Sequence, residues 1–490
     1  MPVLPFGEWR PDVSDLNAST SVDIVNVLPR ADGYGPAPSI NLVSPALPKR
    51  CRGVFRAWNA DGTVTVFAGT EDRLYKLDNT LFTWDDVSKD TSSGFSYGVS
   101  TRASWVFVQY DNRVFATQIG APIQAFTLGT STAFEDLSAS APQCSSIAVV
   151  GRFLVASGIL GARLSIQWSA INDPESWTAG TDQSDVQDFA DGGEVVGVAG
   201  SDDVGLVFQA AAIRRMVYAP GSPVIFQIDR VPGDIGCSTP RSIVQAAGLV
   251  FWFSGAGFYR MAPSGYPEPI GKERVDRTFV ADYNPIYPAN FMGAADPTSS
   301  RILWAYCSVN GAPNLGDKVL VYDYVLNRWS ILEVQTEFIG SIGLPGMTLE
   351  GLDTAYPEYN LDTLPFSLDD FAETGALVVA VFDPTHAMGL FSGSALEATL
   401  ETGEMGSVRR VLIRGITPMS DAPALFGSIS TRGTLQSARI WAAETAPGVT
   451  GMCPARRETR FARARVRIPA GTVWSYITGV DMDSANAGTR

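Results

Sequence analysis

Short apolar runs separated by turn residues recur along most of this chain, and this pattern constrains the fold more than any other feature. Val64–Phe67 and Arg73–Tyr75 form one unit, and Trp105–Val108 and Arg113–Phe115 form the next. The second unit follows the first after about 40 residues, which is a typical length for one blade of a β-propeller. A fixed period of short strands argues against a helical or α/β fold.

Turn residues support the same interpretation. Asp61-Gly62 between Val54–Trp58 and Thr63–Phe67 predicts a hairpin with a type I′ turn. Residues 146–156 are expected to pair with Ala162–Ser169 through a loop that contains two glycines. We therefore predict an all-β chain with a β-propeller of about six to eight blades, in which tryptophans pack between blades.

Three regions follow from this pattern. Residues 1–48 carry eight prolines and no lasting periodicity, so we expect an extended N-terminal arm that either wraps its own chain or joins a neighbouring subunit. Residues 49–395 form the propeller, with an inserted rim segment at 347–375 that contains Asp369 and Asp370. Residues 396–490 form a C-terminal β domain or a set of propeller-closing strands, because the strands lengthen there.

Charge is distributed unevenly along the sequence. The whole chain carries a net charge of −15. The last 90 residues hold 12 arginines and 7 acidic residues, so they carry +5 and the first 400 residues carry −20. An acidic body repels nucleic acid and favours solubility.

An arginine-rich strand is the strongest charge feature. Arg463, Arg465 and Arg467 alternate with small or apolar residues, so they share one face of a strand. This face could contact a partner protein, pair with acidic residues of the same chain, or bind nucleic acid. The candidate contact residues for a subunit or adaptor are Trp9, Arg10, Arg456, Arg457, Arg460, Arg463, Arg465 and Arg467.

No catalytic or cofactor motif stands out. His386 is the single histidine and lies in a turn, so we expect it to be non-catalytic, and no zinc motif or phosphate-binding loop is present. Five widely spaced cysteines predict buried free thiols from a reducing compartment. The start of the chain lacks the features of a signal peptide, and no apolar run is long enough to span a bilayer. We therefore expect no enzyme activity, no cofactor and no bound metal.

Several segments resemble one family of viral proteins. The resemblance begins in the first 40 residues, continues at two tryptophan-containing turns, and reappears near the end. It is carried by Pro5–Asp12, Val25–Pro29, Asp32–Pro36, Trp168-Ser169 with Asp173–Trp177, Tyr322–Ser330, Phe391–Gly393, Ala398–Gly403 and Gly479–Asp481. In these segments the chain is similar to tail nozzle and tail hub proteins of short-tailed bacteriophages.

The resemblance implies a structural virion protein, made in the host cytoplasm and located in the tail. It implies a homo-oligomeric ring, commonly a hexamer, below the portal and adaptor and beside other tail proteins. Such a ring retains packaged DNA and conducts it during ejection without sequence-specific binding. Two other hypotheses remain open: a host-surface protein that binds glycans, which predicts an exposed aromatic cluster, and a propeller hydrolase, which predicts two converging carboxylates.

Overall fold

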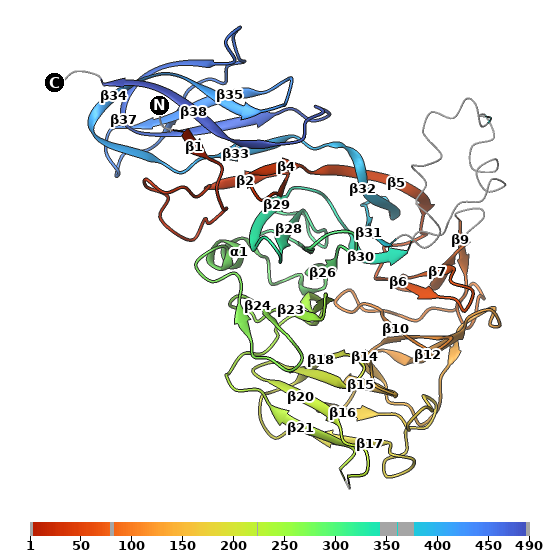
Figure 1. Ribbon diagram of the computed structural model, residues 1–490. Coiled ribbons are helices and arrows are strands. Elements are labelled where there is room, and N and C mark those ends of the chain that lie inside the picture. Colours follow the sequence, from red (N-terminus) through yellow and green to blue (C-terminus); the bar gives the residue numbers. More distant parts are fainter. Residues whose placement is uncertain (1–2, 79–82, 223, 344–359, 361–376, 487–490) are drawn as a thin grey trace.

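The computed structural model describes residues 3–78, 83–222, 224–343, 360 and 377–486. Strands dominate this part of the chain (Figure 1). The helical elements there are α1 (Asp276–Asp282), η1 (Pro240–Ser242) and η2 (Pro288–Asn290). The prediction of an all-β propeller with a further C-terminal β region is confirmed.

Six four-stranded sheets form separate blades. Five of them are consecutive in sequence, and each is an antiparallel meander. The first two of these blades are β6 (Gly53–Trp58), β7 (Val64–Gly69), β8 (Leu74–Leu77) and β9 (Trp84–Asp86), followed by β10 (Val106–Tyr110), β11 (Arg113–Gln118), β12 (Ala121–Thr127) and β13 (Glu135–Asp136). The next two are β14 (Cys144–Val150), β15 (Phe153–Ile159), β16 (Ala162–Trp168) and β17 (Asp185–Asp188), followed by β18 (Val195–Gly200), β19 (Val204–Gln209), β20 (Ile213–Tyr218) and β21 (Phe226–Arg230). The fifth is β22 (Val244–Ala246), β23 (Leu249–Phe253), β24 (Phe258–Met261) and β25 (Glu268–Pro269).

A further four-stranded meander continues the ring after β25. It consists of β26 (Met292–Ala295), β27 (Arg301–Tyr306), β28 (Lys318–Asp323) and β29 (Arg328–Leu332). Unlike the six separate blades, this unit belongs to a sheet of 14 strands, which it joins through the pairing of β29 with β2 (Asp23–Val25). The ring therefore contains seven four-stranded units, within the expected range of six to eight.

The N-terminal segment closes the ring. The last blade contains β30 (Phe338–Gly343), β31 (Leu377–Phe382) and β32 (Ala387–Ala395), and its outer strand is β5 (Pro38–Ala46). β30 packs against β6 of the first blade. Because β5 pairs with β32 over Ala46↔Ala387 to Pro38↔Ala395, the two ends of the propeller are joined by hydrogen bonds within one sheet. The ring thus includes residues of the segment that the sequence predicts to be an arm.

Tryptophans hold neighbouring blades together, as predicted. The Trp105 indole N–H donates to the Thr70 carbonyl of the preceding blade at 2.8 Å. The Trp304 indole N–H likewise donates to the Ser242 carbonyl at 3.0 Å. Both rings are fully buried, so each contributes apolar packing and satisfies its single polar atom at the same time.

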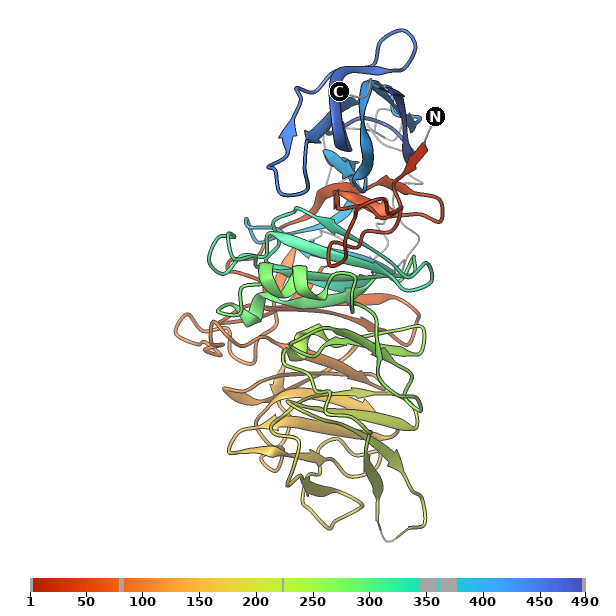
Figure 2. The same cartoon turned by 90° about the vertical axis from the view of Figure 1, so that its left-hand side faces the viewer.

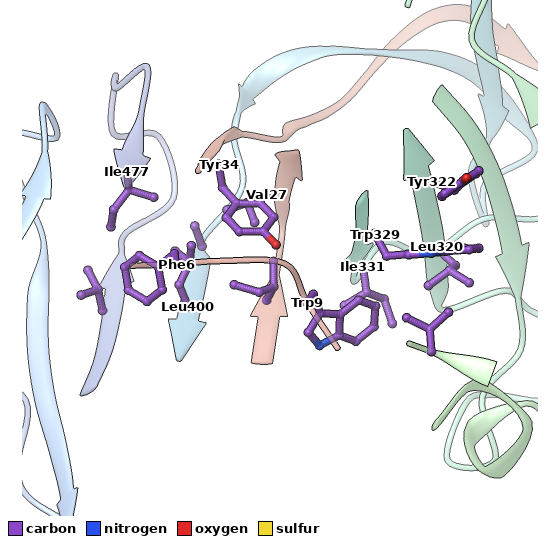
Figure 3. Close-up of a cluster of buried hydrophobic side chains, with 14 of the residues drawn as sticks. Phe6, Trp9, Val27, Tyr34, Leu320, Tyr322, Trp329, Ile331, Leu400 and Ile477 are labelled. Atoms are coloured by element: carbon purple, nitrogen blue, oxygen red, sulfur yellow. The ribbon is translucent and has the colours of Figure 1, made fainter. Parts of the chain in front are cut away.

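The rest of the N-terminal arm wraps its own chain. β1 (Val3–Pro5) pairs with β38 (Ile477–Asn486), and β3 (Val27–Pro29) pairs with β4 (Tyr34–Pro36). β2 (Asp23–Val25) lies between β29 and β33 (Ala398–Glu401). Figure 3 shows arm side chains in the core between the propeller and the C-terminal region. Phe6, Trp9 and Tyr34 pack there with Trp329 of the ring and Ile477 of the C-terminal region.

The C-terminal region is built on two long strands. They are β34 (Met405–Ser420) and β37 (Cys453–Ile468), which pair antiparallel. The remaining strands are β33 (Ala398–Glu401), β35 (Phe426–Arg432), β36 (Ile440–Trp441) and β38 (Ile477–Asn486). Figure 2 shows this region at one end of an elongated molecule, beyond the propeller.

Two local predictions are wrong. The Asp61-Gly62 hairpin has a longer loop than a two-residue type I′ turn, because Trp58 pairs with Val64 and only Gly62 has a positive φ. Residues 146–156 are not one strand, since a turn at Gly151, with φ of 58°, separates β14 from β15. The expected rim insertion at 347–375, with Asp369 and Asp370, lies outside the described residues.

Candidate functional site

The axis of the propeller is not acidic. The first strands of consecutive units contact one another from β6 through β10 and β14 to β18, and from β22 through β26 and β30 back to β6, so these seven strands surround the axis. These seven strands hold one charged residue, Arg56, and burial lowers the pKa of its guanidinium. The wall around the axis is therefore mostly apolar and carries no acid.

Acidic side chains gather instead on the outer strands. In the five consecutive blades, the outermost strands β9, β13, β17, β21 and β25 hold eight acidic residues and a single basic residue, Arg230. The acidic residues are Asp85, Asp86, Glu135, Asp136, Asp185, Asp188, Asp229 and Glu268. A groove of about 470 Å³ is lined by residues of β17 and β21, and Asp188, Asp191 and Asp229 contribute to it. We call these outer strands the acidic edge.

The arginine face of β37 pairs with acidic residues of the same chain. Arg465 lies opposite Glu401 of β33, and its Nε donates to Glu401 Oε1 at 2.7 Å. Arg467 donates to Glu397 at 3.0 Å and to Glu444 at 2.8 Å. Arg465 and Arg467 also stack on Trp441 and Phe426 respectively. Of the three alternatives for this face, self-pairing is the one that the structure shows.

The same network reaches the N-terminal arm. Arg463 is 5% exposed and bonds to both Glu401 and Asp15. Glu404, whose side chain is 1% exposed, pairs with Arg432 and Arg439. A buried charge whose partners are removed costs several kcal/mol. The network therefore fixes the arm on the C-terminal region.

The remaining arginines of β37 are exposed. Arg456, Arg457 and Arg460 lie beside three exposed arginines of β34, namely Arg409, Arg410 and Arg414. We call these six residues the basic strand pair. Two of them have acidic partners, since Arg410 is 3.5 Å from Glu458 and Arg414 is 3.5 Å from Asp483. In the described ranges the other four show no ion pair, so this surface keeps a net positive charge.

Trp9 and Arg10 are held by their own chain. Trp9 is 5% exposed, and its indole N–H donates to the Val22 carbonyl at 3.0 Å. Arg10 is half-buried and donates to the Glu273 carbonyl. Of the candidate contact residues, the structure thus leaves Arg456, Arg457 and Arg460 with exposed side chains, whereas Trp9 and Arg463 are buried.

His386 lies in a turn with φ of 71°, and its Nδ1 is 2.8 Å from Glu337 Oε2. Burial raises the pKa of Glu337, and the imidazole opposes this shift. The neighbouring Cys51 thiol is also buried, which raises its pKa to about 12. A thiol with that pKa stays protonated at neutral pH and is a poor nucleophile. All five cysteines are free and buried, as predicted.

Features that other functions need are sparse in the described part of the chain. No cluster of three or more His, Cys, Asp or Glu side chains there could hold a metal ion. No described helix is long and apolar enough to cross a membrane. The exposed large aromatic residues of the described ranges are Trp58, Tyr266 and Tyr476, which lie on three separate parts of the chain.

Comparisons with known proteins show only weak likenesses. No protein-family model matches the chain, and no curated protein matches it. The computationally designed Ika8 protein aligns with 10% identity and a TM-score of 0.37 over 72% of this chain and 99% of its own. The extracellular domain of a protein described as a hybrid two-component system from B. thetaiotaomicron aligns with 9% identity and a TM-score of 0.40 over 82% of this chain and 47% of its own. Hsv2 of Kluyvelomyces marxianus aligns with 11% identity and a TM-score of 0.33 over 58% and 84%. Because these three TM-scores are below 0.5, none of these likenesses bears on function.

Proposed function

We propose that this chain is a structural subunit of a ring in the tail of a short-tailed bacteriophage, where the ring retains packaged DNA and conducts it during ejection. The observation that carries the proposal is the separation of charge along the molecule. The basic strand pair belongs to the C-terminal region at one end, and β17 and β21 of the acidic edge lie at the opposite end (Figure 1).

This separation favours head-to-tail contact between copies. A basic surface on one copy attracts an acidic surface on the next and repels its own kind. Contacts between two different surfaces generate rings when the rotation closes. A symmetric dimer through either surface alone would instead bring like charges together.

The acidic edge also fits passage of DNA. Duplex DNA binds surfaces that neutralise its phosphates with lysine and arginine, so a bore lined by acidic edges would offer few points of attachment. The propeller axis is a poorer candidate for the conduit because its wall is apolar. The bore would then lie between subunits and be lined by β9, β13 and β25 of the acidic edge, because β17 and β21 at the far end would contact the next copy.

Negative-stain electron microscopy of the purified chain, alone and mixed with portal–adaptor assemblies of its source phage, tests the proposal. We expect rings that cap the assembly and whose opening is wide enough for duplex DNA. Charge reversal by Arg456→Glu with Arg460→Glu should abolish the rings. Arg102→Glu, which changes an exposed arginine of a propeller loop, should leave them intact. Discs that never join the assembly would contradict the proposal, and glycan screening would then test the host-surface alternative.

A further inference from the structure

One end of the propeller axis carries three arginines. Arg50 and Arg52 immediately precede β6, and Arg241 precedes β22. Asn290 precedes β26, and Glu337 precedes β30. Because all these residues stand just before strands that surround the axis, they lie at the same end of it.

Arg241 reaches across that end. Its guanidinium lies 4.4 Å from the centre of the Phe338 ring, and its Nη1 is 3.5 Å from the Arg52 carbonyl oxygen. The β22 and β6 blades are separated by two units of the ring, so the side chain spans the axis instead of packing on its neighbour. No carboxylate of the described residues lies within ion-pair distance of Arg241. Burial lowers its pKa to about 10, and Arg50 adds to this shift, so the group is still charged at neutral pH.

Several donors here lack acceptors. Arg50 donates to Asn290 Oδ1 at 2.8 Å, and this bond fixes the orientation of the amide, because a flipped amide would place its NH₂ against the guanidinium. Asn290 is 2% exposed, yet its Nδ2 has no partner. Arg241 Nε and Arg52 Nε are also buried without partners. Buried donors of this kind are normally satisfied by protein, water or a ligand.

The nearby acids do not balance the arginines. Glu337 interacts with Arg50 and is hydrogen-bonded to His386. Arg52 is 3.7 Å from Glu71, whose side chain is 40% exposed. Arg241 is left without a counter-charge, and Arg50 raises the cost of charging it. A convergent set of guanidinium and amide donors with excess positive charge is the arrangement that binds oxyanions.

We propose that Arg241, Arg50 and Asn290 form a binding site for an oxyanion of the phosphate class at this end of the propeller axis. The site takes free phosphate or the phosphate of an ester, and it is separate from the acidic edge and from the basic strand pair. Arg50 and Arg241 are of intermediate exposure as whole residues, and burial lowers the pKa of both guanidinium groups. An anion there would accept hydrogen bonds from the unpartnered donors. It would thereby link the blades that begin with β6, β22 and β26.

Thermal unfolding in inorganic phosphate tests the site, with ionic strength held constant by sodium chloride. We expect the midpoint to rise with phosphate concentration in the manner of a saturable ligand. Arg241→Met should abolish that rise because it removes the donors and keeps the side-chain length. Arg102→Met, an exposed arginine outside the site, should leave it unchanged. An equal rise in both variants, or no rise in the unchanged protein, would overturn the proposal.

A second variant protects the test against a folding defect. Asn290→Asp keeps the acceptor for Arg50 and supplies a carboxylate in place of the unpartnered NH₂. We expect it to raise the midpoint without phosphate and to remove the response to phosphate. Calorimetric titration of the unchanged protein gives a direct reading, and the absence of binding at millimolar phosphate would contradict the site. Titration with a nucleoside 5′-monophosphate distinguishes free phosphate from a phosphate ester as the ligand. A site that accepts only free phosphate would not bind the monophosphate.

Discussion

Arg463 lies where three parts of the chain meet. It belongs to β37, it bonds to Glu401 of β33, and it bonds to Asp15 of the N-terminal arm, which is 448 positions away in sequence. A guanidinium is suited to this position because its fork of donors can serve two carboxylates at once. The residue is thus a structural junction and not a surface contact.

Replacement of Arg463 tests this role. Arg463→Ala should lower the free energy of unfolding by about 3 kcal/mol, because the buried Glu401 carboxylate and the partly buried Asp15 carboxylate each lose one of their arginine partners. Arg456→Ala removes an exposed arginine from the same strand and should change the free energy of unfolding by less than about 0.5 kcal/mol. Urea unfolding of the two variants provides the comparison. Equal effects would show that the Arg463 network adds no stability.

Asp23 gives the chain a pH dependence. Burial raises its pKa to about 6, and the Glu401 carboxylate opposite it adds to the shift, while Arg465 opposes it. The folded state therefore binds the proton more tightly than the unfolded state, so the free energy of unfolding falls as pH rises from about 4 to about 6. Asp23→Asn should raise the free energy of unfolding by on the order of 2 kcal/mol above pH 7 and should leave it unchanged below pH 4. Denaturant unfolding at pH 4 and pH 8 measures both values, with Asp32→Asn as an exposed control. A gain of the same size at both pH values would exclude Asp23 as the cause.

At the scale of elements, β5 determines whether the ring is closed. The strand comes from the N-terminal segment and completes a blade whose other strands lie more than 290 residues later. This closure adds backbone hydrogen bonds within one sheet to the apolar packing between blades, and the two together hold the circle closed. A defect in the β5–β32 pairing should therefore loosen the whole propeller.

Gly389 is the position at which to test the closure. A Cβ atom there would lie 2.5 Å from Ile40 Cγ2 and 2.8 Å from the Asn41 carbonyl oxygen, so Gly389→Val should displace β5 from β32. Limited proteolysis should then cut between residues 38 and 46, whereas pairing with β32 should protect this segment in the unchanged protein. Gly433→Val is a matched control because its Cβ meets nothing within 4 Å. Resistance of the Gly389→Val chain to the protease would show that the pairing tolerates the side chain.

The sequence predicts elements better than it predicts their partners. The blade period and the buried tryptophans follow from local pattern, since turn residues and alternating apolar residues act over a few positions. The closure by β5 does not follow, because prolines in residues 36–48 conceal a strand whose partner is remote in sequence. The alternation of Arg463 and Arg465 predicts a shared face, but their carboxylates come from distant segments that no spacing rule connects. The sequence does not predict the site around Arg241 for the same reason. Arg241, Arg50 and Asn290 precede three different inner strands that are far apart in sequence.

At the scale of the whole molecule, charge and shape act together. The acidic edge and the basic strand pair lie on different parts of an elongated body, and the network around Arg463 keeps the basic region in a fixed position (Figures 1 and 2). Fixed charges separated in this way orient approaching copies before they touch. High salt should therefore weaken assembly of the proposed ring.

The acidic edge can be tested in assembled particles. Asp85→Lys with Glu135→Lys should slow DNA release, because phosphates would bind the new cations. The paired control Asp32→Lys with Asp203→Lys makes the same change in charge away from the outer strands. Release kinetics can be followed with a dye that binds emerging DNA. Equal rates in both variants would argue against an acidic bore.

The closure by β5 has a consequence for synthesis on the ribosome. Residues 38–46 emerge early, but their partner at 387–395 appears only after almost 350 further residues have been translated. During that interval β5 is an unpaired strand edge, and it is open to pairing with the wrong chain. The two prolines within β5, at positions 38 and 45, limit such pairing because neither can donate a backbone hydrogen bond. The order of translation thus makes ring closure a late event. The first propeller strand to leave the ribosome is among the last to form its hydrogen bonds.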